Sequence, residues 1–328
     1  MTFFIESVGA GLLFWNLKDY HSFSFALYSS IFHSISAFCN SGLSLYSDNF
    51  MGFNNNAHVM LVLMSLIVLG GLGFIVVYEV FYILLNKKRN SGRISISLHT
   101  KIALTGSLFF IMFGAISIWL LEYRGILHDM SIAHQIFNSF FLSITSRTAG
   151  FNTVDISLLS VPTILLVISL MFIGGCPGST AGGIKIHTFL TVLVLIRNKF
   201  KGLGMASLFR RKIPEATVDR AVTIFISSLL IIFITAFLLQ LVENIAVPYL
   251  EIKLREGFLD TLFEAVSAFG TVGLSTGATA YLSSWGKAII IFLMFIGRVG
   301  PLTLGIALQV RPKHVISYEF PNEEIILT

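Results

Sequence analysis

Long apolar stretches and short polar ones alternate along this chain. The apolar blocks are residues 61–85, 102–121, 161–196, 222–242 and 288–308. A helix needs roughly 20 apolar residues to cross a bilayer, and none of these blocks shows the alternating pattern of a membrane strand. The pattern therefore predicts an all-α integral membrane protein with several spanning helices.

Three shorter amphipathic stretches, at about residues 26–38, 134–146 and 257–269, each lead into a loop of small residues around one glycine. The loops read SAFCNSGLS, SITSRTAGFN and SAFGTVGLS, with a phenylalanine ten residues before each glycine and Leu or Phe directly after it. These stretches are too short to span a membrane. Irregular backbone at membrane depth is tolerated only where it is buried in protein or lines a water-filled path. The pattern thus predicts repeated units of helix, re-entrant pore-helix loop and helix.

The chemistry of these loops favours a cation pathway. A ring of backbone carbonyls can replace the water shell of a permeating cation, and the C-terminal end of a preceding short helix favours positive charge. Glycine allows the backbone to turn so that successive carbonyls face one axis. One such loop alone is more often an ordinary turn, but three in register favour a filter. The predicted ion-binding residues are Asn40, Ser41, Gly42, Thr148, Ala149, Gly150, Thr271, Val272 and Gly273.

The apolar block 161–196 is interrupted by FIGGCPGSTAGGIKIH, which holds five glycines and Pro177. An ordinary spanning helix does not survive that density of helix breakers, so we expect a mobile constriction in the pathway rather than a packing kink. The predicted gating-loop residues are Gly174, Gly175, Gly178, Ser179, Thr180, Gly182, Gly183 and Lys185. Nucleotide binding is rejected because Ile184 separates Gly183 from Lys185, which breaks the phosphate-loop spacing.

Two arginines lie within or beside the predicted membrane segments. Arg298 lies near the middle of block 288–308, and we expect it in the pore below the filter because an intramembrane charge is costly and usually functional. Arg147, beside the second glycine loop, is expected to pack behind that loop or to meet an acid such as Asp155. No nucleophile, base and orienting residue can be assembled, so an enzyme is not expected.

Composition and charge support a membrane location. Of the 328 residues, 55% are hydrophobic and 12% are charged, and the mean hydropathy is +0.84. The formal net charge of +5 comes from basic residues concentrated in segments 87–101 and 197–220, which fits the positive-inside rule better than nucleic-acid binding. We expect a multi-pass protein of the cytoplasmic membrane whose glycine loops enter from the outer side.

Four strings, SITSRTAGFNTVD, FIGGCPGSTAGGIK, SAFGTVGLSTG and FIGRVGPLTL, resemble the Trk/Ktr/HKT superfamily of potassium transporters, specifically the Ktr-type membrane subunit, over nearly the whole chain. The resemblance implies a potassium pathway at the centre of four pseudo-equivalent units, each contributing one filter glycine. It places the gating loop at 174–183 and a pore-facing arginine at Arg298. It also implies a homodimer on a cytosolic nucleotide-binding ring, potassium uptake that is commonly sodium-stimulated, and no cofactor. The basic inner loops and the tail YEFPNEEIILT are the expected docking surfaces.

The chain departs from the family pattern in two respects. Only three of the four repeats are expected: residues 1–97 with a truncated first helix, 98–212 with a broken inner helix, and 213–312, followed by a cytosolic tail at 313–328. The chain is expected to begin inside the first helix of the family's second repeat. In addition, the first loop reads Cys-Asn-Ser-Gly-Leu where the family more often has Asn-Asn-Ala-Gly-Phe.

Three functions follow from these expectations. The leading hypothesis is a pore-forming subunit for potassium uptake across the cytoplasmic membrane, with selectivity from loop carbonyls. The alternative is a non-conducting remnant or assembly partner of such a system, since three loops cannot make a four-sided filter. A secondary transporter that uses the broken helix at 174–183 is less favoured, because such carriers usually show paired inverted repeats.

Overall fold

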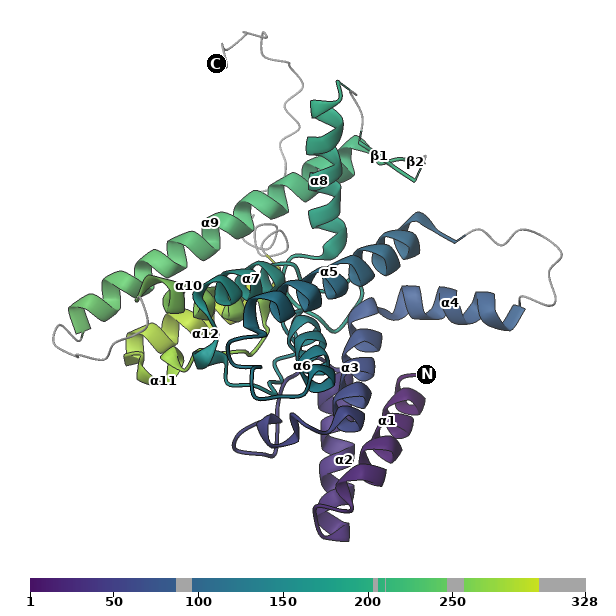
Figure 1. The fold of residues 1–328 in the computed structure, drawn as a ribbon. Coiled ribbons are helices and arrows are strands. Elements are labelled where there is room, and N and C mark those ends of the chain that lie inside the picture. Colours follow the sequence, from purple (N-terminus) through teal and green to yellow (C-terminus); the bar gives the residue numbers. More distant parts are fainter. Residues whose placement is uncertain (87–95, 203–205, 210, 247–256, 301–328) are drawn as a thin grey trace, which may run out of the picture.

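The computed structural model describes residues 1–86, 96–202, 206–209, 211–246 and 257–300, which fold as a helical bundle (Figure 1). The helices are α1 (Thr2–Leu17), α2 (Phe23–Phe38), α3 (Ala57–Leu72), α4 (Phe74–Asn86), α5 (Leu98–Glu122), α6 (Ile132–Thr145), α7 (Val161–Phe172), α8 (Ile186–Phe200), α9 (Glu215–Ala246), α10 (Phe258–Gly270), α11 (Ala278–Tyr281) and α12 (Ser284–Val299). Short 3₁₀ turns at Met51–Phe53 and Ile156–Leu158 lie between helices. The strands β1 (Ser207–Leu208) and β2 (Arg211–Lys212) form a small antiparallel hairpin, a minor exception to the all-α prediction.

The helix order repeats three times as a first helix, a short helix and a second helix: α1–α2–α3, α5–α6–α7 and α9–α10–α12. The short helices α2, α6 and α10 lie where the amphipathic stretches predicted them, and each ends at a glycine loop. The expected boundaries after residues 97 and 212 fall between elements, whereas the boundary at 312 and the tail 313–328 lie outside the described residues. The division into these units as such stays a prediction.

Not every apolar block forms one continuous spanning helix among the described residues. Two helices are long and apolar enough to cross a bilayer by themselves, α5 and the 29-residue stretch Glu215–Glu243 of α9. Block 61–85 is instead split into α3 and α4, which bend by 102° at Gly73, whose φ is +84°. Block 288–308 is helical as far as Val299, and its remainder from residue 301 lies outside the described residues.

The first and second helices of two units are joined by the same contact. The Glu122 carboxylate at the end of α5 accepts from the backbone N–H (2.8 Å) and hydroxyl (2.7 Å) of Ser160, the N-cap of α7. Near the end of α9, Glu243 accepts likewise from Ser283, the N-cap of α12, at 3.1 and 2.8 Å. A carboxylate at a helix N-terminus satisfies free N–H groups and meets the positive end of the helix dipole. The contact thus ties the first helix to the second helix in these two units.

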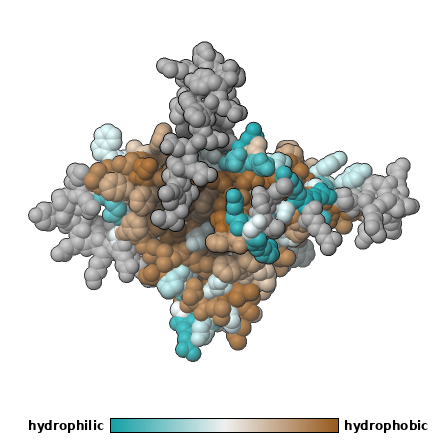
Figure 2. Space-filling model, turned by 90° about the horizontal axis from the view of Figure 1, so that it is seen from above, coloured by the Kyte–Doolittle hydropathy of each residue, from teal (hydrophilic) through white to brown (hydrophobic). Residues whose placement is uncertain are grey.

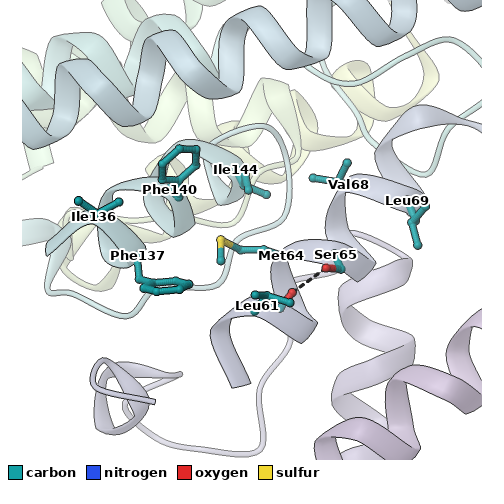
Figure 3. Close-up of a pocket in the computed structure, with 9 residues that line it drawn as sticks. All are labelled: Leu61, Met64, Ser65, Val68, Leu69, Ile136, Phe137, Phe140 and Ile144. Atoms are coloured by element: carbon teal, nitrogen blue, oxygen red, sulfur yellow. Dashed lines mark hydrogen bonds between the residues drawn. The ribbon is translucent and has the colours of Figure 1, made fainter. Parts of the chain in front are cut away.

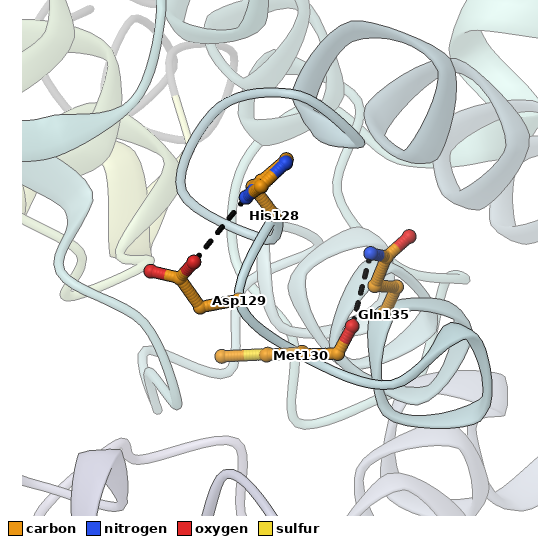
Figure 4. A network of polar contacts seen from close by, with 4 residues as sticks. All are labelled: His128, Asp129, Met130 and Gln135. Atoms are coloured by element: carbon orange, nitrogen blue, oxygen red, sulfur yellow. Dashed lines mark hydrogen bonds and ion pairs between the residues drawn. The ribbon is translucent and has the colours of Figure 1, made fainter.

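The surface of the bundle is largely apolar. In Figure 2 brown side chains dominate the visible described face, as expected where a protein borders lipid. The α5–α6 connection is one of the polar exceptions, and it holds an exposed His128–Asp129 pair at 3.2 Å (Figure 4). Gln135, in the first turn of α6, donates to the carbonyl of Met130 in this connection at 3.1 Å. This hydrogen bond fixes how the chain enters the short helix.

Candidate ion pathway

The three glycine loops share one backbone conformation. Each glycine has positive φ, +70° at Gly42, +84° at Gly150 and +91° at Gly273. The residue two positions earlier also has positive φ in every loop: Asn40 at +49°, Thr148 at +79° and Thr271 at +49°. The residue between them does not, so left-handed and ordinary backbone alternate. The positive φ at each glycine is the left-handed backbone that the sequence led us to expect there.

Hydrogen bonds tie each loop back to its own short helix. We call the residues after each glycine, 43–46, 151–154 and 274–277, the outgoing legs. The Ser36 hydroxyl donates to the Leu43 carbonyl at 2.8 Å, and Ser267 donates to Leu274 at 2.6 Å in the same register. In the second loop Thr145 donates to the Phe151 carbonyl at 2.6 Å. The three loops are therefore similarly stapled.

Neighbouring loops contact each other in one repeated way. A Cβ on Gly42 would lie 2.6 Å from the Ala149 carbonyl oxygen, and a Cβ on Gly150 would collide with the Val272 carbonyl oxygen. In both cases, the carbonyl that precedes one glycine faces the glycine of the previous loop. Glycine is thus required at these positions for the close approach of neighbouring loops.

The third side of this arrangement is open. Gly273 meets no carbonyl, since its Cβ would have only the Gly150 Cα within 4 Å, at 3.6 Å. Ser41 and Gly273 are exposed, whereas every residue from 141 to 151 is buried. Between the first and third loops lies a cavity of about 720 Å³, lined by Asn40, Ser41, Thr271, Gly273, Glu264 and Arg298 among others. The predicted filter residues of the three loops therefore lie close together, and the cavity separates the first loop from the third.

A second cavity is chemically unsuited to an ion. The groove between α3 and α6 has about 670 Å³ and is lined by apolar side chains such as Met64, Phe137 and Phe140 (Figure 3). The only hydroxyl in its wall, that of Ser65, donates to the Leu61 carbonyl at 2.8 Å. Such a wall cannot compensate a cation for its lost water.

The predicted gating loop, residues 174–183 with Lys185, contacts the ends of short helices that lead into the glycine loops. The Thr180 hydroxyl donates to the Phe38 carbonyl at the end of α2, at 3.1 Å. Gly182 packs so closely on the end of α10 that a Cβ there would lie 2.6 Å from the Gly270 carbonyl oxygen. The loop thus covers the C-terminal ends of two of the short helices.

The α3–α4 break forms a second partner of the gating loop, which the sequence reasoning missed. Cys176 N–H donates to Gly71 O (2.9 Å), Thr180 N–H donates to Gly70 O (3.4 Å), and Phe74 N–H donates to Gly178 O (3.2 Å). Gly70 must lack a side chain, because a Cβ there would collide with Phe38 O. The sequence does contain a signal for this break. Gly70-Gly71-Leu72-Gly73 has glycines at its first and last positions, as does Gly297-Arg298-Val299-Gly300 at the end of the second helix of the third unit.

The structure corrects the placement of Arg298. It lies in the last turn of α12, which ends before Gly300 (φ +88°), rather than in the middle of a spanning helix. It does border the cavity below the loops, where Nη1 donates to the Thr180 carbonyl at 2.9 Å. The end of α12 is therefore joined to the gating loop at Thr180, the residue whose hydroxyl also bonds the end of α2.

Arg147 packs behind the second loop, and the alternative of a contact with Asp155 is wrong. Its guanidinium, with the residue 8% exposed, donates at 3.4 Å to Ser107 and to the Gly174 carbonyl of the gating loop. The Asp155 carboxylate instead accepts from the N–H and hydroxyl of Ser157. The arginine therefore holds the gating loop from the side away from the cavity.

These features define a class of protein: a membrane protein built from repeated units of helix, short helix with a glycine loop, and helix, whose glycine loops contact one another. The sequence profile of the TrkH family, described as cation transport proteins, matches residues 2–316. The chain belongs to this family, which is one of transporters and not of enzymes, and it is a multi-pass membrane protein.

Relatives agree with this assignment. The chain is 38% identical to Ktr system potassium uptake protein B of Bacillus subtilis over 91% of this chain and 64% of that protein. It is 37% identical to potassium/sodium uptake protein NtpJ of Enterococcus hirae over 92% of this chain and 64% of that protein. The chain thus spans slightly less than two thirds of the length of these relatives.

A solved structure shares the fold. The crystal structure of the potassium transporter TrkH from Vibrio parahaemolyticus matches with a TM-score of 0.70 at 20% sequence identity, over 87% of this chain and 58% of that one. At this identity the likeness shows the architecture alone. It confirms the predicted fold class of helices with re-entrant pore-helix loops.

Proposed function

We propose that this chain is a pore-forming subunit for potassium uptake across the cytoplasmic membrane. The observation that carries the proposal is the repeated contact in which the carbonyl of one loop faces the glycine of the previous one, from Val272 to Gly150 and from Ala149 to Gly42. A ring built by this step presents several carbonyls to one dehydrated cation without using fixed charge. In this proposal the filter residues 40–42, 148–150 and 271–273 supply these carbonyls.

The ring needs one more step to close. If the same contact were repeated, the Ser41 carbonyl would face the glycine of a fourth loop. The carbonyl before that glycine would in turn face Gly273. The cavity of about 720 Å³ between these residues leaves room for such a loop. We therefore propose that a fourth glycine-loop unit completes the filter on this side. Gating is assigned to residues 174–183 with Lys185, held in place by Arg298.

The partners and ions are proposed on the same basis. A homodimer on a cytosolic nucleotide-binding ring fits a Ktr-type subunit, and the exposed basic residues Arg197, Lys199 and Lys201 at the end of α8 offer it a docking surface. The other expected docking surface, the tail 318–328, lies outside the described residues. Potassium is the transported ion, bound by backbone carbonyls, and sodium stimulates uptake. No cofactor is proposed.

The direct test is uptake in cells that lack their own potassium transporters. Together with the proposed fourth glycine-loop unit, the chain should restore growth at low potassium, and Gly273→Asp should abolish it. Gly202→Asp is the matched control, because Gly202 also has positive φ (+69°) but no atom within 4 Å of a Cβ. Equal growth with Gly273→Asp and wild type would contradict the filter assignment.

A second candidate function, an assembly partner without a pathway of its own, is favoured by the exposed Ser41 and Gly273. It predicts no growth even when the fourth glycine-loop unit is supplied, combined with stable association of the purified chain with a complete Ktr membrane subunit. Growth of cells that contain this chain and the fourth unit would exclude it.

A further inference from the structure

We propose that His33 and Glu264 are equivalent positioning residues that hold the outgoing legs of the first and third glycine loops and thereby set ion selectivity. Each lies nine residues before its loop glycine, His33 before Gly42 and Glu264 before Gly273. The inference rests on the proposed function of these loops as a filter. Their side chains differ in charge and shape, but the hydrogen bonds that they accept coincide.

In the first loop the acceptor is an imidazole nitrogen. The Leu45 N–H donates to His33 Nε2 at 3.2 Å, and the Ser44 hydroxyl lies 3.3 Å from the same nitrogen. Because a backbone N–H can only donate, Nε2 must be unprotonated, and the ring proton is therefore on Nδ1, which lies 3.0 Å from the Ser29 hydroxyl. His33 is fully buried, and its ring stacks on Tyr46 with centroids 5.1 Å apart. The imidazole is thus fixed in one orientation.

In the third loop the acceptor is a carboxylate. Glu264 Oε1 accepts from the Ser275 hydroxyl at 2.6 Å and from the Thr276 N–H at 3.0 Å. The Thr279 hydroxyl donates to the other oxygen. Ser275 and Thr276 are the second and third residues after Gly273, as Ser44 and Leu45 are after Gly42. We call this pair of contacts, from the hydroxyl at the second position and the N–H at the third, the brace.

The second loop has no brace of this kind. The residue nine positions before Gly150 is Phe141, which accepts no hydrogen bond through its side chain, and the buried Thr153 hydroxyl at the third position has no partner among the described residues. The segment that follows the first loop supports this leg instead, since Phe50 N–H donates to Asn152 O at 3.0 Å. A loop buried between two others is supported by them, whereas the two outer loops carry their own brace.

The brace acts on selectivity through carbonyl position. A carbonyl cage distinguishes cations by the size and field of the site that it offers, and an unsupported loop contracts or spreads more readily around a smaller ion. Functional groups must be held to within about half an ångström by packing and by the hydrogen bonds behind them. The glycine loops are stapled on one side by Ser36 and Ser267, so the brace is the second attachment that fixes each leg.

The test compares His33→Leu and Glu264→Leu with Phe141→Leu, the control at the same position of the loop that has no brace. Hydrogen exchange of the purified chain reads out the brace without transport: exchange should accelerate about 5- to 150-fold in segment 43–46 for His33→Leu and in segment 274–277 for Glu264→Leu, and in neither for Phe141→Leu. The variants His33→Gln and Glu264→Gln, which keep an acceptor oxygen, should restore most of the protection. Unchanged exchange in the Leu variants would overturn the brace.

The second readout is sodium competition against potassium uptake by the same variants. The Leu variants should be inhibited at lower sodium concentrations, the Gln variants and Phe141→Leu should resemble wild type, and protein levels should stay equal. If exchange changes but competition does not, the residues are structural only and the positioning role is wrong. If wild type itself fails to take up potassium, the proposed function fails instead, and the exchange result still decides the brace.

Discussion

Alanine at the three loop glycines should cause graded destabilisation in the order Gly150, Gly42, Gly273. All three have positive φ, which costs an L-residue about 1–2 kcal/mol. At Gly42 the added Cβ would also lie 2.6 Å from Ala149 O and 2.9 Å from the Gly150 Cα, and at Gly150 it would collide with Val272 O. Overpacking of this kind adds about 1–3 kcal/mol. At Gly273 the nearest atom is at 3.6 Å, an ordinary contact, so only the backbone cost applies.

The expected loss of unfolding free energy is therefore about 2–5 kcal/mol for Gly42→Ala and Gly150→Ala, and about 1–2 kcal/mol for Gly273→Ala. The measurement is thermal or denaturant unfolding of the detergent-purified chain. Gly202→Ala calibrates the backbone term alone, because Gly202 shares the positive φ and its Cβ would meet nothing within 4 Å. The proposed packing of the loops is refuted if Gly150→Ala costs no more than Gly202→Ala, or if Gly273→Ala is the most damaging of the three.

Three further predictions concern the gate and the unit ends. Thr180→Val removes the hydroxyl that donates to Phe38 O and should favour the open gate about 2- to 13-fold, measured as the rate of rubidium efflux from proteoliposomes, whereas Thr180→Ser should behave as wild type. Arg298→Ala removes the contact between Arg298 and the Thr180 carbonyl of the gating loop and should raise the same efflux, with Arg298→Lys intermediate; unchanged efflux would contradict a holding role. Glu122→Ala leaves the Ser160 N–H and hydroxyl without their acceptor and should lower the unfolding free energy by about 1–3 kcal/mol while sodium competition stays unchanged.

The short helices and their loops could be predicted from the sequence because their signal is local. An amphipathic stretch that is too short to span, followed by a glycine, encodes its own structure, and α2, α6 and α10 begin and end within a few residues of the expected positions. Positive φ at Gly42 and its counterparts follows from the same local reasoning. The sequence does not indicate which neighbouring loop each glycine loop contacts, because these contacts depend on the tertiary packing of the three units.

The break at Gly73 was not predicted because block 61–85 contains no charge before Glu79 and no proline. Glycines are common in continuous membrane helices, so Gly70, Gly71 and Gly73 do not by themselves indicate a break. The 102° bend is supported by tertiary hydrogen bonds to the gating loop, and a partner about 100 residues away leaves no trace in local hydropathy. Arg298 was misplaced for a related reason, because the apolar block continues past the residue at which the helix ends.

The equivalence of His33 and Glu264 was hidden by their chemistry. A hydrophobic pattern does not group a histidine with a glutamate. Neither residue is spaced from other polar residues as metal ligands are. Only their common distance from the glycine links them, and that distance becomes meaningful once both are seen to accept from the same two positions of the outgoing leg. A search for repeats should therefore compare acceptor capacity at fixed offsets, and not residue identity alone.

The contacts of the proposed gating loop give a physical reason why a closed gate and a conducting pathway would exclude each other. The last carbonyls of a helix lack partners within it and form the negative end of its dipole. Below the glycine loops these are the groups that would stabilise a cation leaving the filter, yet Phe38 O accepts from Thr180, and Gly182 covers Gly270 O. Withdrawal of the loop would free the same oxygens for the ion. We infer that the gate closes by occupying the cation-stabilising ends of α2 and α10 as well as by filling space, so that opening and ion stabilisation are one event.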